Sequence, residues 1–429
     1  MAHEAMEYFE DLGRRIEERW RSAGFDDRAI SSIAEEELVR TPAHLHVTPD
    51  DVLEWCNRPG FDLPAQSDLE ARFGDPPVTV FRARQMVIDV NFWIDSPIAI
   101  HEHSFDGAFQ VLSGSSMHTQ YDFVEKARYN SYTYAGDLTA HDTEQLSPGD
   151  VRQIRAGSEF IHALFHLERP SSTVVVRTLE NPLVGIQRDF VAPGFAFSSF
   201  HIDPTAQRNT QVARLMITCE SPRFEAWLTR YLEAADPGAT FHMLLTVWTA
   251  WRERPDVTAS ELDARIDPFI SLVEKSSSWG TLVASAFRDR LRSMQLMSAR
   301  YAVEDPEQRW FLALLLNAPS STRILSAVER RFPTESPLDK VFGWVEELCV
   351  QRTVLGIMLS KATLRIARCL AQGKTHEAIA RELSEGRTQP LSARDIESAA
   401  RELRRSPLRP LFLFPARTSR PRAGSGLAT

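Results

Sequence analysis

The segment IAIHEHSFDGAFQVLSG, residues 98–114, places His101 and His103 one residue apart in a short run with the composition of a β-strand. Alternate residues of a strand point to the same face, so we expect the two imidazoles to lie together while Glu102 points away. Two imidazoles on one face, inside a small barrel, can bind one metal ion without rearranging the backbone. The pair therefore predicts a metal site in a β-domain.

A further histidine follows a predicted turn. In the stretch LSPGDVRQIRAGSEFIHALFHLERP, residues 146–170, a Pro-Gly-Asp turn precedes a strand that carries His162 and His166 on one face. If this strand lies beside the first pair, His162 completes a three-histidine site. Three neutral imidazoles with open coordination positions suit Fe(II), and also Zn, Ni, Cu or Mn, so ligand type alone does not choose the metal.

Short strand-like runs fill the region from Val78 to about residue 180. Each is rich in Val, Ile, Phe, Tyr and Thr, and each is bounded by Gly, Pro, Asp or Ser. Eight such runs in succession predict an antiparallel β-barrel or jelly roll.

The regions on both sides of these strands are helical in pattern. The predicted fold class is α+β, with a β-barrel flanked by a short N-terminal helical segment and a large all-α C-terminal domain. The predicted domains are an N-terminal helical segment (1–75), the β-barrel domain (76–205), an α-helical domain (206–405) and an Arg-rich, disordered tail (406–429).

Capping signals predict where several helices begin. The candidate first residues or caps are Thr48, Asp305 before Pro306, Ser336 before Pro337, Thr375 and Ser392. The last two helices resemble a helix-turn-helix, but the second carries Asp395, Glu397 and Glu402, which suit a DNA major groove poorly. Oligomerisation or partner contact is the favoured interpretation.

The composition narrows the possible classes of protein. The chain has 429 residues, a net charge of −9 and 43% hydrophobic residues, which argues against a general nucleic-acid or membrane-surface binder. Its 4 cysteines are scattered without CxxC spacing, so neither a zinc finger nor a disulfide framework is expected. The N-terminus lacks the apolar core of a secretory signal, and a cytoplasmic protein without a membrane span is expected.

The histidine pattern resembles the cupin superfamily, whose first motif is G(x5)HxH(x3–4)E(x6)G and whose second is G(x5)PxG(x2)H(x3)N. The positions that match are His101, His103 and Gly114 in the first motif, and Gly149, Gly157 and His162 in the second. The glutamate position of the first motif falls on Gly107, Arg155 stands where proline is usual, and His166 replaces the asparagine. The resemblance covers roughly residues 78–190.

A cupin without the glutamate is similar to the thiol dioxygenases and other three-histidine oxygenases, which use mononuclear Fe(II) and O2. This resemblance implies metal ligation by His101, His103 and His162, and a small substrate that chelates the iron. It also implies an arginine that holds a substrate carboxylate. Arg82 and Arg84, on a strand before the histidine pair, and Arg177 are candidates, since an inward arginine binds a carboxylate through its bidentate fork. His166 is a candidate fourth ligand or proton relay, with a core histidine as the alternative.

Two functions from different classes follow. The first is a mononuclear non-heme Fe(II)-dependent oxygenase acting on a small metal-chelating substrate with O2, in a homodimer. The alternative is a non-catalytic metal- or ligand-sensing cupin whose helical region is the partner-binding output. A cofactor-free cupin isomerase is ranked last.

Four further histidines lie outside the predicted metal site, and the sequence indicates no function for them. His44 and His46 repeat the spacing of the metal pair, but they lie beside prolines between helices and are assigned to a loop. His118, in a predicted strand with polar neighbours, and His141, in a predicted loop, are candidate rim residues of the β region.

Overall fold

The structure is a computed structural model that describes residues 2–57, 64–66, 74–94, 99–179, 185–385 and 391–414. The chain divides into two compact units, residues 1–313 and 314–429, and the division falls within helix α9 (Pro306–Asn317). The first unit contains all described strands together with the described α-helices that precede α9. The chain is therefore α+β, with antiparallel sheets and many helices.

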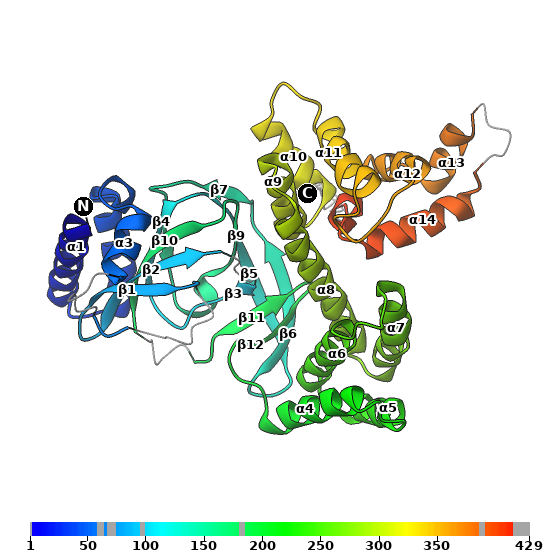
Figure 1. The fold of residues 1–429 in the computed structure, drawn as a ribbon, viewed down its shortest axis with the longest axis horizontal. Coiled ribbons are helices and arrows are strands. Elements are labelled where there is room, and N and C mark those ends of the chain that lie inside the picture. Colours follow the sequence, from blue (N-terminus) through cyan, green and yellow to red (C-terminus); the bar gives the residue numbers. More distant parts are fainter. Residues whose placement is uncertain are drawn as a thin grey trace, which may run out of the picture. The chain divides into compact units, whose positions relative to one another are not determined.

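Three helices precede the sheets and cover one face of the first sheet (Figure 1). They are α1 (Ala2–Ser22), α2 (Asp27–Arg40) and α3 (Pro49–Cys56), and the short 3-10 helix η1 (Ala43–Leu45) lies before α3. Phe9, Leu12 and Ile30 from the helices share a core with Val80 and Ile88 from the sheet. The helices are thus held by burial of their apolar faces, the dominant favourable term in folding.

Twelve described strands follow, and all pairings between them are antiparallel. They are β1 (Pro77–Arg82), β2 (Met86–Trp93), β3 (Ile100–His101), β4 (Gly107–Ser113), β5 (Ser116–Arg128), β6 (Thr133–Ala140), β7 (Glu144–Leu146), β8 (Val151–Ile154), β9 (Ile161–His166), β10 (Ser171–Thr178), β11 (Arg188–Val191) and β12 (Phe195–Ser198).

The strands form a five-stranded sheet of order β1-β2-β10-β4-β8 and a seven-stranded sheet of order β6-β12-β11-β3-β9-β5-β7. On β10, Val174 and Val176 join the core beneath the N-terminal helices, whereas Val175 points to the opposite face. Val175 there shares an apolar cluster with Leu146 and Leu164 of the second sheet. The two sheets therefore pack face to face, and the period-2 alternation of β10 divides its side chains between two cores.

Helices α4 to α8 complete the first unit. They are α4 (Pro204–Thr218), α5 (Phe224–Ala234), α6 (Pro237–Arg252), α7 (Ala259–Ser276) and α8 (Gly280–Ala302). Phe195 and Phe197 of β12 belong to the same apolar cluster as Phe241 and Val247 of α6 and Phe287 of α8. These helices therefore share a core with strand β12 of the second sheet.

The second unit is helical in its described part. After the end of α9 it contains α10 (Ser321–Arg331), α11 (Pro337–Glu346), the π-helical segment η3 (Glu347–Gln351), α12 (Lys361–Ala371), α13 (His376–Ser384), α14 (Ala393–Arg405) and the 3-10 helix η4 (Arg409–Phe412). Its core includes the buried residues Val341, Leu348, Ile366 and Leu403.

The predicted caps are confirmed. Thr48, Ser336, Thr375 and Ser392 each accept a hydrogen bond from a backbone N–H of the helix that follows. Asp305 accepts from the backbone of Gln308 at 2.9 Å. Local side-chain chemistry is enough to specify where these helices begin.

The predicted disordered tail, 406–429, is corrected for residues 406–414, and residues 415–429 lie outside the described residues. Leu411 and Phe412 are buried, and the Leu413 carbonyl accepts from the backbone N–H of Ser321 at 2.9 Å. The apolar residues of this segment bury enough surface to hold it against the helices, despite the arginines between them.

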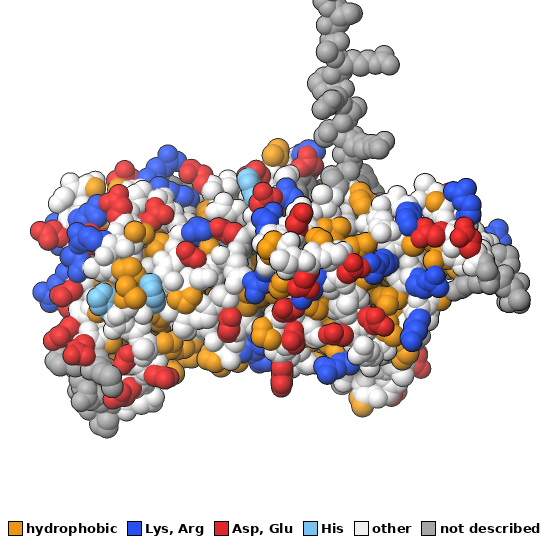
Figure 2. Space-filling model, turned by 90° about the horizontal axis from the view of Figure 1, so that it is seen from above, with side chains coloured by type: hydrophobic (Ala, Val, Ile, Leu, Met, Phe, Trp, Pro, Cys, Tyr) orange, Lys and Arg blue, Asp and Glu red, His pale blue; other side chains and the backbone are white. Residues whose placement is uncertain are grey.

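None of the described helices combines the length and the apolar character that crossing a membrane requires. Figure 2 shows basic and acidic side chains interspersed over the described part of one face.

Candidate metal centre

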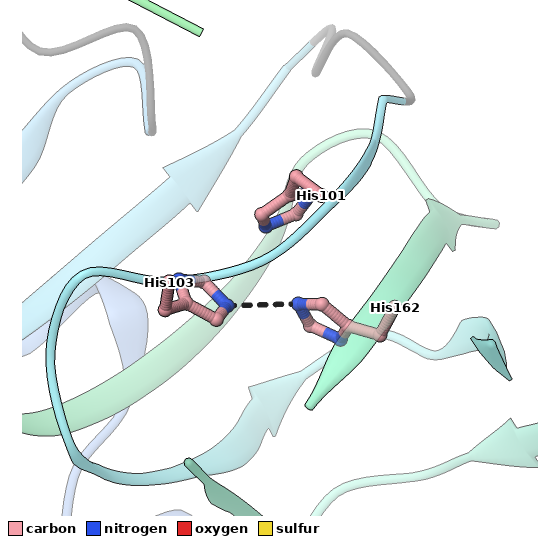
Figure 3. A group of neighbouring side chains, drawn as sticks. All are labelled: His101, His103 and His162. Atoms are coloured by element: carbon pink, nitrogen blue, oxygen red, sulfur yellow. Dashed lines mark hydrogen bonds between the residues drawn. The ribbon is translucent and has the colours of Figure 1, made fainter. Parts of the chain in front are cut away.

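The three histidines predicted as ligands come together between strands β3 and β9 (Figure 3). His101 lies directly opposite His162 in the antiparallel pair of β3 and β9. The expectation that His101 and His103 share one continuous strand is corrected, because β3 ends at His101 and His103 forms an isolated bridge with Ala156. Gly157 donates its N–H to the His103 carbonyl at 2.8 Å, which holds this residue in place.

The side chains are close enough to share one ion. One ligand nitrogen from each ring lies within 4.8 Å of the others, and the Nε2 atoms of His103 and His162 are 3.0 Å apart. Nitrogens that bind one ion at about 2.1 Å lie roughly 3 to 4 Å apart, so small ring rotations would bring all three to one centre. The exposed fractions of His101, His103 and His162 are 8%, 7% and 2%, which places the group inside the protein.

Burial lowers the pKa of each of these imidazoles. The pKa values of His103 and His162 are well below the ordinary value of 6.5, and the neighbouring imidazoles add to the shift. The pKa of His101 is also lowered, mainly by burial. The rings are therefore neutral at pH 7, which is the form of imidazole that binds a metal ion.

Hydrogen bonds orient two of the rings. His101 Nδ1 lies 3.0 Å from the Ala99 carbonyl, which can only accept, so the proton is on Nδ1 and the lone pair on Nε2. His162 Nδ1 lies 3.1 Å from Nε2 of His118. Proteins usually orient a metal-binding histidine through a hydrogen bond from the ring nitrogen that does not bind the metal.

His118 itself is fully buried and is held by a carboxylate. Its Nδ1 lies 2.8 Å from Glu144, which also accepts from Arg152 Nε at 2.9 Å. These hydrogen bonds, from His118 first and then from Arg152, lower the pKa of Glu144 to about 2. Glu144 is therefore a carboxylate at neutral pH.

Aromatic rings surround the histidines. Phe160 lies 4.5 Å from His162 and Phe105 lies 4.7 Å from His103, measured between ring centroids, and Phe109 lies 6.0 Å from His162. This apolar environment limits the access of water and strengthens electrostatic interactions within the group.

Arg177 is the predicted arginine that lies nearest to this group. Its guanidinium stacks over Phe105 at 5.3 Å, and its charge contributes to the lowered pKa of His103. Its Nε donates to Asp89 at 2.9 Å, and the Arg177 side chain is 16% exposed. Asp89 also accepts from the hydroxyl of Thr79 at 2.7 Å.

Arg82 and Arg84 are placed elsewhere. Both are exposed, Arg82 donates to the Ala65 carbonyl at 3.2 Å, and Arg84 lies in the turn between β1 and β2. The structure does not bring either of them to the three histidines. The strand parity that decides this could not be assigned from the sequence.

His166 is buried two positions beyond His162 on β9. Its Nδ1 lies 2.9 Å from the Ser116 hydroxyl, and its ring stacks on Trp93 at 4.7 Å. Burial, and then the charge of Arg300, lower its pKa to about 3. These contacts are those of a core histidine, and His166 does not belong to the three-histidine group that could hold a metal ion.

The position of the missing motif glutamate has no room for a side chain. A Cβ on Gly107 would lie 2.0 Å from the Val176 carbonyl oxygen of the paired strand β10. Glu102 cannot take over this role, because its carboxylate binds Arg188 at 2.7 and 2.9 Å. Among the described residues, the group that could hold a metal ion therefore consists of imidazoles alone.

His118 and Glu144 are the site residues that sequence reasoning missed. His118 was only a candidate rim residue without a role, yet it is fully buried and contacts His162. The available signal was a histidine on a predicted strand of the β region. To recognise His118 as a neighbour of His162, one would also need the strand register, in which Gln120 of β5 lies opposite His162 of β9.

Comparisons with known proteins locate distant structural neighbours only. No protein-family model matches the chain, and no curated protein matches it. A DMSP lyase from Ruegeria pomeroyi matches with 16% identity and a TM-score of 0.18, over 29% of this chain and 55% of that chain. The chain thus spans about half the length of that protein.

Two other solved structures are similar in the same way. A structure described as one of the DMSP lyases RdDddP and RnDddQII has 16% identity and a TM-score of 0.24, over 42% of this chain and 94% of that chain. A sugar phosphate isomerase from a cupin superfamily, from Silicibacter pomeroyi, has 16% identity and a TM-score of 0.20, over 33% of this chain and 88% of that chain.

Proposed function

We propose that this protein is a metal-dependent enzyme with a cupin-type β-domain, in which His101, His103 and His162 hold one divalent transition-metal ion. The observation that carries the proposal is the meeting of three buried, neutral imidazoles whose nitrogens lie within 4.8 Å of one another. Neutral imidazole is the form of histidine that binds a metal ion, and three such rings this close together can share one ion. The ring hydrogen bonds of His101 and His162 leave the lone pair on Nε2, as ligation requires.

The finer proposal is a mononuclear non-heme Fe(II) oxygenase. Three imidazole ligands suit Fe(II), and the absence of space for a carboxylate at Gly107 leaves coordination positions for other molecules. The chemistry that bound Fe(II) would supply is the activation of O2 toward a substrate. Zn, Ni, Cu and Mn suit the same donor set, so metal analysis has to decide between them.

Arg177 would bind an anionic group of the substrate. Asp89 accepts from Nε only, and the terminal amino groups of the guanidinium make no hydrogen bond to a described residue. Those groups form the fork that matches a carboxylate. The proposed substrate is therefore a small carboxylate-bearing molecule, oriented by Arg177 while Phe105 and Phe160 exclude water.

The first experiment is elemental analysis of untagged protein purified without chelator, followed by anaerobic Fe(II) reconstitution and measurement of O2 uptake. We expect about one iron ion per chain, and O2 consumption with a compound from a panel of small thiols, amino acids and 2-oxo acids. Iron uptake without O2 consumption across the panel would favour the non-catalytic sensing alternative. Absence of metal uptake would refute the metal site.

Alanine variants test the assignment of the ligands. Each of the variants His101→Ala, His103→Ala and His162→Ala lacks one of the three proposed metal ligands. Each should therefore contain less than a tenth of the iron bound by the wild-type protein, while the helical circular dichroism signal stays unchanged. The control is His46→Ala, which removes an exposed ring that stacks on Tyr8 outside the site. Loss of iron in the control, or full iron content in the His162 variant, would contradict the assignment.

Substitution of Arg177 tests the substrate proposal. Arg177→Met should raise KM for a carboxylate substrate by about 10- to 100-fold, the equivalent of roughly 1.5–3 kcal/mol of lost charged hydrogen bonding, and leave iron content unchanged. Arg82→Met, in an exposed arginine of β1, is the control and should leave KM unchanged. An unchanged KM in Arg177→Met would remove Arg177 from the substrate site.

A further inference from the structure

A line of hydrogen bonds leads from the protein surface to His162. Arg152 on β8 donates to Glu144 on β7, Glu144 contacts Nδ1 of His118 on β5 at 2.8 Å, and Nε2 of His118 contacts Nδ1 of His162 on β9 at 3.1 Å. The side chain of Glu144 is 42% exposed, whereas that of His118 is 0% exposed. The line thus crosses from solvent to the candidate metal ligand in two steps.

The chemistry of the groups fixes the direction of each hydrogen bond. A carboxylate can only accept, so Nδ1 of His118 carries the proton that faces Glu144. A neutral imidazole carries one proton, so Nε2 of His118 has the lone pair and must accept from His162. The proton of His162 is therefore on Nδ1, and its Nε2, which faces His103 at 3.0 Å, has the lone pair.

We infer that His118 and Glu144 are positioning residues that hold His162 in the tautomer able to bind the metal ion. The inference deepens the proposed function and rests on it, because the tautomer matters only if His162 is a ligand. Neither residue lies in the histidine motifs from which the ligands were predicted. The arrangement depends on the register that places His118 of β5 opposite Glu144 of β7.

Packing supports a positioning role. The fully buried His118 ring packs near Phe109 and Phe160, at 6.1 and 6.0 Å between centroids, which restricts rotation of the ring. Two hydrogen bonds from Arg152 hold Glu144 in turn. These contacts specify one tautomer of His118, because the opposite tautomer would direct the lone pair of Nδ1 at the Glu144 carboxylate, which can only accept.

The decisive test measures directly which ring nitrogen of His162 carries the proton in the metal-free protein. Long-range 1H–15N correlation spectra of protein labelled with 15N-histidine distinguish a protonated ring nitrogen from a bare one. We expect wild-type His162 to be protonated at Nδ1. In His118→Phe, which keeps the ring volume and removes the acceptor, His162 should show a mixture or the opposite tautomer. In His118→Gln, whose side-chain oxygen can still accept, the Nδ1–H form should return.

A matched pair of carboxylate variants tests the role of Glu144 separately from that of His118. Glu144→Gln replaces an obligate acceptor by an amide that also donates, so His118 and His162 should both show tautomer mixtures. Asp122→Asn makes the same change in the pair of Asp122 with the exposed His141, at 2.9 Å, and should leave His162 unaltered. A pure Nδ1–H form of His162 in both His118→Phe and Glu144→Gln would overturn the inference.

Metal affinity provides the second readout, with Co(II) as the probe in competition with a chelator. We expect Co(II) to bind about 10- to 100-fold more weakly to His118→Phe than to wild type, with partial recovery in His118→Gln. Wild-type affinity in His118→Phe would overturn the positioning role while the metal site stands. Failure of the wild-type protein to bind Co(II) would overturn the proposed function instead, and the tautomer spectra would still decide whether His118 sets the proton on His162.

Discussion

Glu37 is a buried carboxylate that three arginines contact. Arg15, Arg19 and Arg40 approach it at 3.0, 2.8 and 2.6 Å, and the Glu37 side chain is 0% exposed. Burial acts to raise its pKa, but the hydrogen bonds from Arg19 and Arg15 outweigh burial, so the pKa lies below the ordinary 4.5. This group ties α1 to the end of α2.

Replacement of Glu37 should destabilise the first unit in a pH-dependent way. We expect Glu37→Gln to lower the free energy of unfolding at pH 7 by about 2 kcal/mol, measured by urea denaturation. A lowered folded-state pKa stabilises the folded form above the ordinary pKa, so the difference from wild type should shrink as the pH falls below 4.5. The control Glu36→Gln, in an exposed pair with Arg19, should change stability by less than about 1 kcal/mol. A difference that grows on acidification would contradict this account.

At the same scale, the three clustered histidines could be predicted from the sequence because each lies in a recognisable pattern. His101 and His103 are one residue apart, and His162 follows a turn and a strand-like run. His118 was not open to prediction, because its significance depends on a neighbour 44 positions away in the chain. Arg82, Arg84 and Arg177 all had suitable chemistry, and only the orientation of each strand selected Arg177.

Strand β4 shows how closely two elements can approach. Gly107 begins this strand opposite Arg177 of β10, and an added Cβ would meet the Val176 carbonyl at 2.0 Å. Glycine is the residue for such a close backbone approach. The spacing also explains, at the level of packing, why the position of the motif glutamate carries no ligand.

Two glycine substitutions should have opposite effects at the level of the elements. Gly107→Ala should destabilise the first unit by about 1–3 kcal/mol, because the strands must separate to admit the methyl group. Gly343→Ala, at an exposed position inside α11 with nothing within 4 Å of the new Cβ, should stabilise the second unit by up to about 1 kcal/mol. Denaturant unfolding of both variants measures these changes. A stable Gly107→Ala would show that β4 and β10 tolerate a wider spacing.

On the scale of the whole molecule, the chain consists of two units with cores of their own, and the candidate metal centre lies in the first. Binding to the native state stabilises only the part that unfolds with the site. Metal binding should therefore stabilise the first unit without stabilising the second.

Metal addition should raise the stability of one unit selectively. We expect calorimetry to show two unfolding transitions, and a metal concentration of 100 times Kd should stabilise the first unit by about 2.7 kcal/mol. The other transition should not move, and Gly343→Ala identifies it by shifting that transition alone. Chelator should reverse the effect, and His162→Ala should abolish it. Equal shifts of both transitions would show that the units unfold together.

The sequence by itself determined the features that depend on neighbouring residues. These are the α+β class, the antiparallel strands, the helix starts at Thr48, Ser336 and Ser392, and the histidines able to bind a metal. Periodicity, capping and ligand spacing all act within a few residues, so a single chain displays them. The tertiary structure alone decided the end of β3 before His103, the burial of His118 against His162, the burial of Leu411 in the predicted tail, and the placement of Arg177 rather than Arg82 beside the site. Each of these depends on strand register or on contacts between residues far apart in the chain, which local pattern does not encode.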